Sequence, residues 1–303
     1  MNIQVDKLCF RYNQIEPPVP ALDQVSFSLQ TGECVALVGP SGSGKSTLAQ
    51  HLNGLLKPDS GSIRIDGKLL GWSARELRDL RRRVGLVFQF PEAQIFEADV
   101  FSEVAFAAYQ WGIPREEIRG KVERALHSVG LEAESFYDRN PLKLSGGETR
   151  LISIASLLVV DPDWLILDEP TLGLDFAHWQ CIRDLILQRL KASRSVLLIT
   201  HDVNLVLQVC PRILVLDQGR IKYDGDSFQL LISNDLCEKL DLIRPDVVRL
   251  WEALKSSLVN GADRADFPEP DAMKIESWIK GRSRVEREKA CSVLLHQLNK
   301  SLP

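Results

Sequence analysis

The chain has 303 residues, of which 45% are hydrophobic and 26% charged, a composition that excludes intrinsic disorder for most of its length. Lys and Arg number 37 against 41 Asp and Glu, and the net charge of −4 supplies no basic field for a nucleic-acid partner. The longest apolar stretch, residues 151–160, is far shorter than the roughly 20 residues that span a bilayer.

The N-terminal residues show no basic stretch followed by an apolar run, so the sequence indicates no secretory signal. The six cysteines are far apart and form no Cys-x-x-Cys pair. This spacing fits reduced, mostly buried thiols better than disulfides or a zinc site. The sequence therefore predicts a protein of the cytosol.

Strand patterns dominate the first part of the chain. Residues 3–38 are predicted to form strands, the last of them fully buried. A glycine-rich turn at 39–44 leads into a helix with apolar residues Leu48, Leu52 and Leu55. Residues 60–65, followed by Asp66-Gly67, predict a strand and a hairpin turn.

Helices and strands alternate in the rest of the main domain. The predicted elements are a basic helix at 75–83, a strand at 84–88, helices at 98–110, at 115–129, from about 145 and after Asp175, and strands at 164–167, 195–200 and 213–215. The segment from about 90 to 160 lacks strand patterns and is predicted to be a helical subdomain. The whole pattern predicts an α/β fold with a mainly parallel core sheet and an N-terminal antiparallel β-portion.

A domain boundary is predicted near residue 225. The main domain would cover 1–225, and residues 226–303 would form a mostly helical extension with a polar, Pro-containing loop at 261–271. Residues 281–303 carry an apolar stripe preceded by arginines, which indicates a helix packed on its own extension. Docking of this stretch on a membrane surface is the alternative.

The phosphate loop, residues 39–47, consists of Gly39, Pro40, Ser41, Gly42, Ser43, Gly44, Lys45, Ser46 and Thr47. Its glycines let backbone N–H groups converge on phosphate oxygens, and the helix N-terminus adds unpaired donors. Lys45 would reach the β- and γ-phosphates, and the Ser46 hydroxyl would ligate Mg²⁺. The alternative, a flexible Gly/Ser turn, is disfavoured because a buried strand precedes the loop and a helix follows it.

Two carboxylates follow a predicted buried strand. Asp168 and Glu169 stand at its C-terminal end, the edge at which open parallel sheets bind ligands. Side chains of adjacent strand residues point to opposite faces, so the two acids should have different roles. Asp168 suits the Mg²⁺ shell, and Glu169 suits polarisation of an attacking water. An acidic strand end that faces solvent is the alternative.

A turn and a helix start stand between these two motifs in the chain. The segment Leu144-Ser145-Gly146-Gly147-Glu148 has a good N-cap in Ser145 and a glutamate three residues on, as in a capping box. Taken alone, the segment is explained by helix capping. Its position between the phosphate loop and the acidic strand end, however, is the order found in one family of ATPases.

In chain order, GPSGSGKST, Gln89, LSGGE, LILDEP, Leu174-Asp175 and Thr200-His201-Asp202 resemble the nucleotide-binding subunit of an ATP-binding-cassette (ABC) transporter. The resemblance covers about residues 1–225 and implies ATP and Mg²⁺ as cofactors. It implies that Tyr12 stacks on adenine, that Asp175 belongs to the D-loop and that His201 is the switch histidine. The implied catalytic residues are Glu169, His201, Gln89 and Lys45, and the implied Mg²⁺ ligands are Ser46, Gln89 and Asp168.

Residues 87–96, VFQFPEAQIF, are similar to the Q-loop of energy-coupling-factor (ECF) ATPases, and residues 240–245 resemble their C-terminal extension. The resemblance implies that two ATPase subunits sandwich ATP, the phosphate loop of one facing Ser145, Gly146 and Gly147 of the other. Dimer closure would drive a transmembrane coupling protein and a substrate-binding membrane component, which selects a metal ion or a vitamin. The implied place is the cytoplasmic face of the cell membrane.

Two departures from the family pattern keep alternatives open. Glu148 stands where glutamine is usual, and Leu151 and Ser156 stand where basic residues are common. A carboxylate near a γ-phosphate weakens the site by like-charge repulsion, which leaves room for an asymmetric heterodimer. The alternatives are an ABC ATPase of a non-ECF transporter and a regulatory subunit that binds ATP with little turnover. A DNA-repair or translation-factor ATPase is disfavoured, because the chain has neither a long coiled coil nor a second cassette.

The segment Phe90–Phe96 is predicted to be the dock for the transmembrane coupling protein. Phe90, Pro91, Ile95 and Phe96 cluster just after Gln89, in a loop between a strand and the helical subdomain. Aromatic residues exposed on a loop commonly mark an interface. Burial of these side chains in the helical subdomain is the alternative.

Overall fold

The computed structural model describes residues 1–12, 20–90, 94–242 and 248–249. The predictions for Pro91, for residues 243–245, for the loop at 261–271 and for the stretch 281–303 lie outside the described residues. Contacts divide the chain into two units, Met1–Ser227 and Phe228–Pro303. The first unit holds the phosphate loop, Gln89, the LSGGE segment, Asp168 and Glu169, Asp175 and His201.

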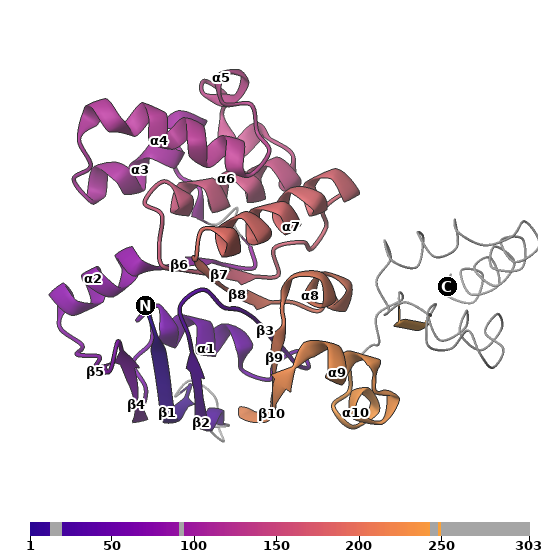
Figure 1. Ribbon diagram of the computed structural model, residues 1–303. Coiled ribbons are helices and arrows are strands. Elements are labelled where there is room, and N and C mark those ends of the chain that lie inside the picture. Colours follow the sequence, from indigo (N-terminus) through magenta and orange to yellow (C-terminus); the bar gives the residue numbers. More distant parts are fainter. Residues whose placement is uncertain (13–19, 91–93, 243–247, 250–303) are drawn as a thin grey trace, which may run out of the picture. The chain divides into compact units, whose positions relative to one another are not determined.

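A six-stranded sheet forms the centre of the first unit (Figure 1). Its strands, in spatial order, are β10 (Arg220–Asp226), β9 (Arg212–Asp217), β3 (Cys34–Val38), β8 (Ser195–Ile199), β7 (Trp164–Asp168) and β6 (Val84–Val87). All neighbours pair in parallel except β10, which runs antiparallel to β9. The parallel strands therefore end at one common edge, where the phosphate loop follows β3 and the two carboxylates, Asp168 and Glu169, stand at the end of β7.

A second, four-stranded sheet is antiparallel and has the order β2 (Pro20–Leu29), β1 (Ile3–Arg11), β4 (Ser60–Ile65) and β5 (Lys68–Leu69). The helix α1 (Lys45–Leu52) packs with both sheets in one hydrophobic core. That core joins Val5 and Leu22 of the small sheet, Leu48 and Leu52 of α1, and Ile166 of the large sheet. Burial of these apolar side chains holds the phosphate loop between the two sheets.

Besides α1 and a 3-10 helix, Pro141–Lys143, the described part of the first unit contains the helices α2 (Ala74–Arg83), α3 (Val100–Gln110), α4 (Arg115–Ser128), α5 (Ala133–Phe136), α6 (Gly146–Leu158), α7 (Phe176–Lys191) and α8 (Val203–Val209). Helices α3, α4 and α6 pack on one another and form a layer above the large sheet (Figure 1). α9 (Ser227–Ile232) and α10 (Asn234–Lys239) follow β10. The α/β fold with a mainly parallel core sheet and an antiparallel N-terminal portion is thus confirmed.

Two details differ from the sequence prediction. The helix after the phosphate loop ends at Leu52, because Asn53 caps it and Gly54 has a positive φ of 71°. Leu55, predicted on its apolar face, lies beyond that end and is exposed. Strand β10 was not predicted from the sequence. Its residues, RIKYDGD, are mostly polar, and in the structure they alternate between exposed and half-buried, so the strand has no buried apolar face.

The cysteines agree with the prediction of free, mostly buried thiols. Cys34, Cys210 and Cys237 are buried, while Cys9 and Cys181 are half-buried. Cys291 lies outside the described residues.

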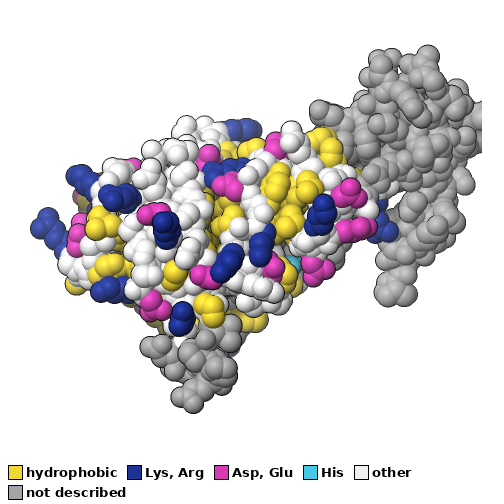
Figure 2. Space-filling view, turned by 90° about the horizontal axis from the view of Figure 1, so that it is seen from below, with side chains coloured by type: hydrophobic (Ala, Val, Ile, Leu, Met, Phe, Trp, Pro, Cys, Tyr) yellow, Lys and Arg dark blue, Asp and Glu magenta, His cyan; other side chains and the backbone are white. Residues whose placement is uncertain are grey.

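The described surface carries charges of both signs. On the face shown in Figure 2, Lys and Arg side chains lie among Asp, Glu and hydrophobic side chains. That face therefore presents no continuous basic area. Among the residues the structure describes, no helix combines the length and the hydrophobicity needed to cross a membrane.

Candidate functional site

The phosphate loop is held by close backbone packing at two glycines. A Cβ on Gly39 would lie 1.9 Å from the carbonyl oxygen of Leu216, and one on Gly44 would lie 2.3 Å from that of Ala21. Both residues have positive φ angles, of 147° and 105°. Since only glycine combines this conformation with this lack of space, the loop shape depends on both residues.

Lys45 is folded onto the loop that precedes it. Its Nζ atom donates to the carbonyl oxygens of Gly39, at 2.8 Å, and Pro40, at 2.9 Å. Burial lowers the pKa of Lys45, while the nearby carboxylates of Glu169 and Asp168 oppose that shift. The loop is thus closed around a buried cation next to two acids.

Asp168 ends β7 beside the start of α1. Its carboxylate is buried and is hydrogen-bonded to the Ser46 side chain. Burial raises the pKa of Asp168, and the Ser46 hydrogen bond and the Lys45 charge only partly offset it. A hydroxyl and a carboxylate oxygen side by side are ligands that Mg²⁺ accepts together with phosphate oxygens.

Glu169 faces the end of the neighbouring strand β8. Its Oε2 atom accepts hydrogen bonds from Thr200 Oγ1 and from the His201 N–H, both at 3.3 Å. Its Oε1 atom lies 3.5 Å from His201 Nε2 and has no hydrogen-bond partner among the described residues. Burial raises the pKa of Glu169, and the His201 side chain opposes that rise.

Tyr12 and the loop enclose a cavity of about 340 Å³, which is lined by Tyr12, Ala21, Gly42, Gly44, Lys45, Ser46 and Thr47. The Tyr12 hydroxyl lies 3.1 Å from Thr47 Oγ1, and its ring packs edge-on against Phe10. An aromatic ring is thereby fixed at the mouth of the phosphate loop.

Gln89 follows β6, and the parallel register pairs Val87 with Leu167, which brings residue 89 level with residue 169. Arg150 of α6 connects these two positions. Its guanidinium donates to the backbone oxygens of Glu169, at 2.6 Å, and Gln89, at 3.2 Å. No role for Arg150 was predicted from the sequence, because a single arginine within a helix gives no local signal of the distant backbone that it contacts.

Ser145 caps α6 through a complete capping box. Its Oγ atom accepts from the Glu148 N–H at 3.2 Å, and Glu148 Oε2 accepts from the N–H and the Oγ of Ser145, at 2.9 and 2.8 Å. The backbone hydrogen bond from Ser145 holds the pKa of Glu148 below its usual range. The capping explanation of this segment is therefore correct, and the Glu148 carboxylate is bound to its own helix start.

Asp175 belongs to a second cluster, together with Gly147. Asp175 caps α7, accepts the N–H of His178 at 2.9 Å and lies 3.0 Å from its Nδ1 atom. A Cβ on Gly147 would lie 3.2 Å from the same His178 ring. The structure thus forms two groups: one around Lys45, Asp168, Glu169 and His201, the other around Ser145, Gly147 and Asp175.

Known proteins are similar to this chain in sequence and in fold. The sequence pattern described as "ABC transporter" matches residues 22–172. The energy-coupling factor transporter ATP-binding protein EcfA2 of Clostridium tetani is 38% identical over 266 residues, 86% of this chain and 91% of that protein. EcfA2 of Clostridium acetobutylicum is also 38% identical, over 84% of this chain and 90% of that protein.

Two solved structures have the same fold. The cbiO1 protein of Clostridium perfringens, described as part of the ABC transporter complex cbiONQ, has a TM-score of 0.69 and 34% identity, covering 82% of this chain and 98% of that one. The ATP-binding cassette MJ0796, solved as a dimer with ADP and Pi, has a TM-score of 0.68 and 29% identity, covering 74% and 98%.

The fold and the phosphate loop place the protein in the class of P-loop ATPases. The similarity over most of the chain shows that it belongs to the ATP-binding subunits of ABC transporters, among relatives named energy-coupling factor transporter ATP-binding proteins. The resemblance seen in the sequence is confirmed, and with it ATP binding and ATP hydrolysis as the activity of the chain.

Proposed function

We propose that this chain powers an ECF-type importer by hydrolysing ATP at the site formed by the phosphate loop, Asp168, Glu169 and His201. The observation that carries the proposal is the position of Glu169. Its carboxylate is buried, contacts His201 and has an Oε1 atom without a hydrogen-bond partner in the described chain. A carboxylate with a free oxygen beside a phosphate loop is suited to accept a proton from water.

The other side chains would bind and orient the nucleotide. Lys45 and the loop N–H groups would hold the phosphates, and Tyr12 would stack on the adenine at the cavity mouth. Ser46 and Asp168, with Gln89, would ligate Mg²⁺, which neutralises phosphate charge. His201, next to Glu169, would contact the γ-phosphate.

Substitution of Glu169 tests this assignment. Glu169→Gln keeps the size of the side chain but removes the base, so turnover should fall by about 10²- to 10⁴-fold. The affinity for ATP should stay within the range of the wild type, because the phosphate loop is untouched. Steady-state phosphate release and binding of a fluorescent ATP analogue measure the two quantities.

Lys45→Ala is the matched control, since it should weaken ATP binding itself. Turnover at the wild-type rate in Glu169→Gln would refute the role of Glu169. A low rate in the unsubstituted chain would instead favour the regulatory subunit with little turnover.

A second ATPase subunit would complete the site. Ser145, Gly146 and Gly147 of one subunit would face the phosphate loop of the other, and Asp175 would lie at the contact between them. The hydrogen bonds from Ser145 keep Glu148 ionised, but they hold its carboxylate at its own helix start. Arg139, 3.8 Å from Glu148 Oε1, offsets part of the repulsion of a phosphate, which supports a competent signature. The molecular mass of the purified Glu169→Gln protein with bound ATP tests whether two copies of this chain pair. Twice the mass of one chain would show a homodimer, and the mass of a single chain would indicate that a different subunit is needed.

A transmembrane coupling protein would dock on the aromatic surface formed by Phe96, Phe106 and Tyr109, at the cytoplasmic face of the membrane. These side chains are exposed, and the rings of Phe96 and Phe106 pack edge-on at 4.7 Å. Phe90, just after Gln89, is 65% exposed. Ile95 is only 8% exposed, so the expectation that it belongs to the dock is wrong.

The dock is tested by placing a charge on the exposed aromatic surface. Phe96 is 60% exposed, so Phe96→Asp should fold and bind ATP but lose the membrane partner on co-purification. Ile95→Asp is the contrast, because a charge at this buried position should lower the thermal stability. A folded Phe96→Asp protein that still co-purifies with the partner would exclude the dock.

A further inference from the structure

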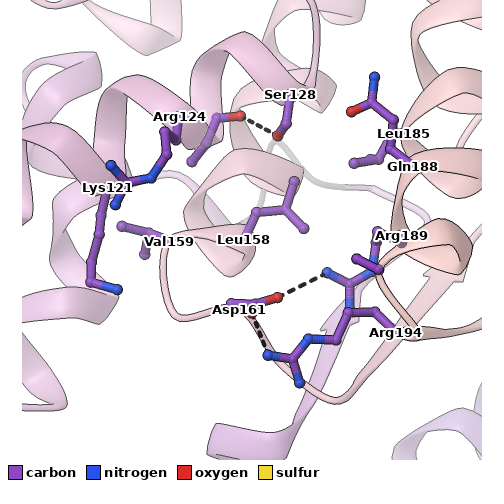
Figure 3. Close-up of a pocket in the computed structure, with 12 residues that line it drawn as sticks. Lys121, Arg124, Ser128, Leu158, Val159, Asp161, Leu185, Gln188, Arg189 and Arg194 are labelled. Carbon is purple, nitrogen blue, oxygen red and sulfur yellow. Dashed lines mark hydrogen bonds and ion pairs between the residues drawn. The ribbon is translucent and has the colours of Figure 1, made fainter. Parts of the chain in front are cut away.

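A second cavity of about 340 Å³ opens between α4, the end of α6 and α7 (Figure 3). It shares no lining residue with the cavity at Lys45. Asp161 and Arg194 in its lining lie just before β7 and β8, at the amino ends of the parallel strands. The cavity therefore lies at the sheet edge opposite to Asp168 and Glu169.

The lining of this cavity is cationic. Lys121 and Arg124 of α4 form one wall, and Arg189 and Arg194 lie across from them (Figure 3). Asp161 is the only carboxylate of the lining among the described residues, so four cations against one carboxylate leave a formal charge of +3. The whole chain has a net charge of −4, so this concentration of positive charge is local.

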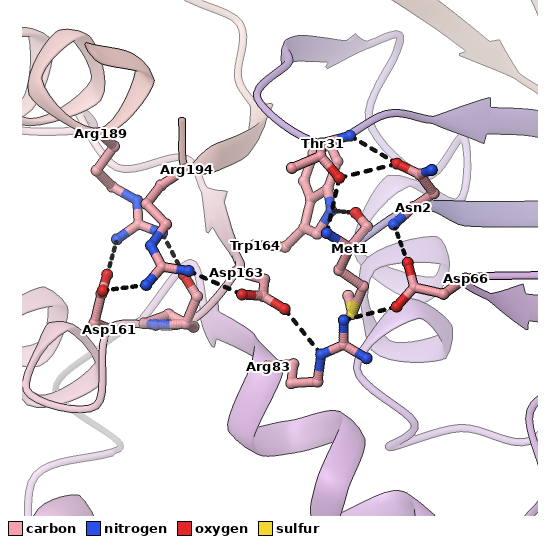
Figure 4. A network of polar contacts seen from close by, with 11 residues as sticks. Met1, Asn2, Thr31, Asp66, Arg83, Asp161, Asp163, Trp164, Arg189 and Arg194 are labelled. Carbon is pink, nitrogen blue, oxygen red and sulfur yellow. Dashed lines mark hydrogen bonds and ion pairs between the residues drawn. The ribbon is translucent and has the colours of Figure 1, made fainter. Parts of the chain in front are cut away.

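The carboxylates nearby are already shared among several arginines (Figure 4). Asp161 contacts both Arg189 and Arg194, and Asp163 is 2.9 Å from Arg194 and 2.8 Å from Arg83. No carboxylate of the described chain forms an ion pair with Lys121 or Arg124. Two cations of the wall are thus available to an incoming anion.

Arg189 is the buried cation of the cavity. Its side chain is only 6% exposed, and its Nε atom has no hydrogen-bond partner among the described residues. Burial lowers the pKa of Arg189 to about 10, although Asp161 opposes the shift. A buried guanidinium that its neighbours satisfy only in part is stabilised by an additional anion.

The remaining lining is apolar and includes Leu158, Val159 and Leu185. A cavity of this volume with apolar walls and a few converging charges is typical of sites for small organic ligands. We propose that this cavity binds a small phosphomonoester, with its phosphate between the α4 and α7 walls and its apolar body on Leu158 and Leu185.

A phosphate fits the charge of the cavity better than a carboxylate. A phosphomonoester carries close to two negative charges at neutral pH and three acceptor oxygens, whereas a carboxylate carries one charge. Arginine forks match phosphate oxygens in pairs. A ligand held by both walls would tie α4 of the helical layer to α7, which follows Asp175. This inference does not depend on the proposed function.

The experiment uses the full chain, saturated with Mg²⁺ and a non-hydrolysable ATP analogue, so that the phosphate loop is occupied. Phenyl phosphate is titrated by calorimetry. The double variant Lys121→Gln/Arg124→Gln should bind it at least about tenfold more weakly than the wild type, because two charge-assisted contacts are lost. Lys57→Gln/Arg115→Gln removes the same charge from exposed positions outside the cavity and should bind as the wild type does.

Thermal unfolding of the ligand-free variants shows whether a loss of binding comes from a folding defect. Loss of two like charges should leave the unfolding temperature of Lys121→Gln/Arg124→Gln unchanged or raise it. Absence of phenyl phosphate binding to the wild type, or equal binding by the double variant, would overturn the site. Inorganic phosphate bound as tightly as phenyl phosphate would overturn the role given to the apolar wall.

Discussion

Glu169 has a backbone conformation that is uncommon for a residue with a side chain, with a φ of 50°. This conformation costs free energy, and the surrounding contacts compensate for it. The Glu169 N–H donates to the carbonyl oxygen of Ile199 at 2.8 Å, and its carbonyl oxygen accepts from Arg150. The turn aims the side chain at Thr200 and His201 instead of along the strand.

Asp168 should destabilise the ligand-free protein at neutral pH. Burial raises its pKa despite the attraction of Lys45, so the folded state disfavours the charged form. Asp168→Asn should therefore unfold at a higher temperature than the wild type at pH 7. As pH falls below the ordinary carboxyl pKa of about 3.9, Asp168 is neutral in both states and the difference should vanish.

Thermal unfolding without nucleotide or Mg²⁺, followed from pH 7 downward, measures this difference. An Asp168→Asn protein that is less stable than the wild type at pH 7 would contradict the argument. With ATP and Mg²⁺ the order should reverse, because bound ligand stabilises the wild type.

Helix α6 connects the ends of two neighbouring strands. Its N-terminus is capped by Ser145 and Glu148, and its Arg150 reaches the backbone after both β6 and β7. The Arg150 guanidinium donates to a carbonyl oxygen at each of the two strand ends, so it links them without an intervening residue. Through it, the position of Gln89 depends on the helix that starts at Ser145.

Arg150→Met should break this link while filling similar space. The buried carbonyl oxygen of Glu169 and the partly buried one of Gln89 would lose a charged donor, so the free energy of unfolding should fall by about 3 kcal/mol. Turnover should fall more than ATP affinity, because Glu169 and Gln89 are affected and Lys45 is not. Chemical denaturation and ATPase kinetics provide the two measurements.

Arg115→Met is the control, since Arg115 is exposed near the start of α4 and should change the free energy of unfolding by less than about 0.5 kcal/mol. If Arg150→Met were as stable as this control, Arg150 would not be a structural link.

The two sheets of the first unit are joined by polar contacts as well as by the shared core. Arg83 at the end of α2 lies 2.8 Å from Asp66, in the turn after β4, and 2.8 Å from Asp163, just before β7 (Figure 4). Burial alone would raise the pKa of Asp66, but the Asn2 N–H and Arg83 together hold it below its usual value. Arg83 therefore spans both sheets.

Arg83→Gln should lower the free energy of unfolding at pH 7 by about 1 kcal/mol, because both ion pairs are partly exposed. The stability that comes from a carboxyl with a lowered pKa exists above its unfolded pKa and is lost as pH falls through the folded pKa. The difference between wild type and Arg83→Gln should therefore shrink below about pH 4. A difference independent of pH would show that packing, and not charge, is responsible.

Local sequence patterns determined the elements that carry the chemistry. The phosphate loop, the strand before Asp168, and the caps at Ser145 and Asp175 depend on residues within a few positions of one another. Backbone hydrogen bonds and side-chain periodicity operate over that range, so the sequence alone predicts them. Their order along the chain was enough to identify the family.

Contacts between distant residues required the folded chain. Arg150 is 61 residues from Gln89, and the cationic cavity joins α4 to residues beyond 158. Likewise, Ile95 is buried and its neighbour Phe96 is exposed, because only one side of this loop packs against the rest of the protein. Neither the hydrophobic periodicity of the sequence nor the spacing of its motifs predicts such contacts, because they form only when packing of the hydrophobic core brings separate elements together.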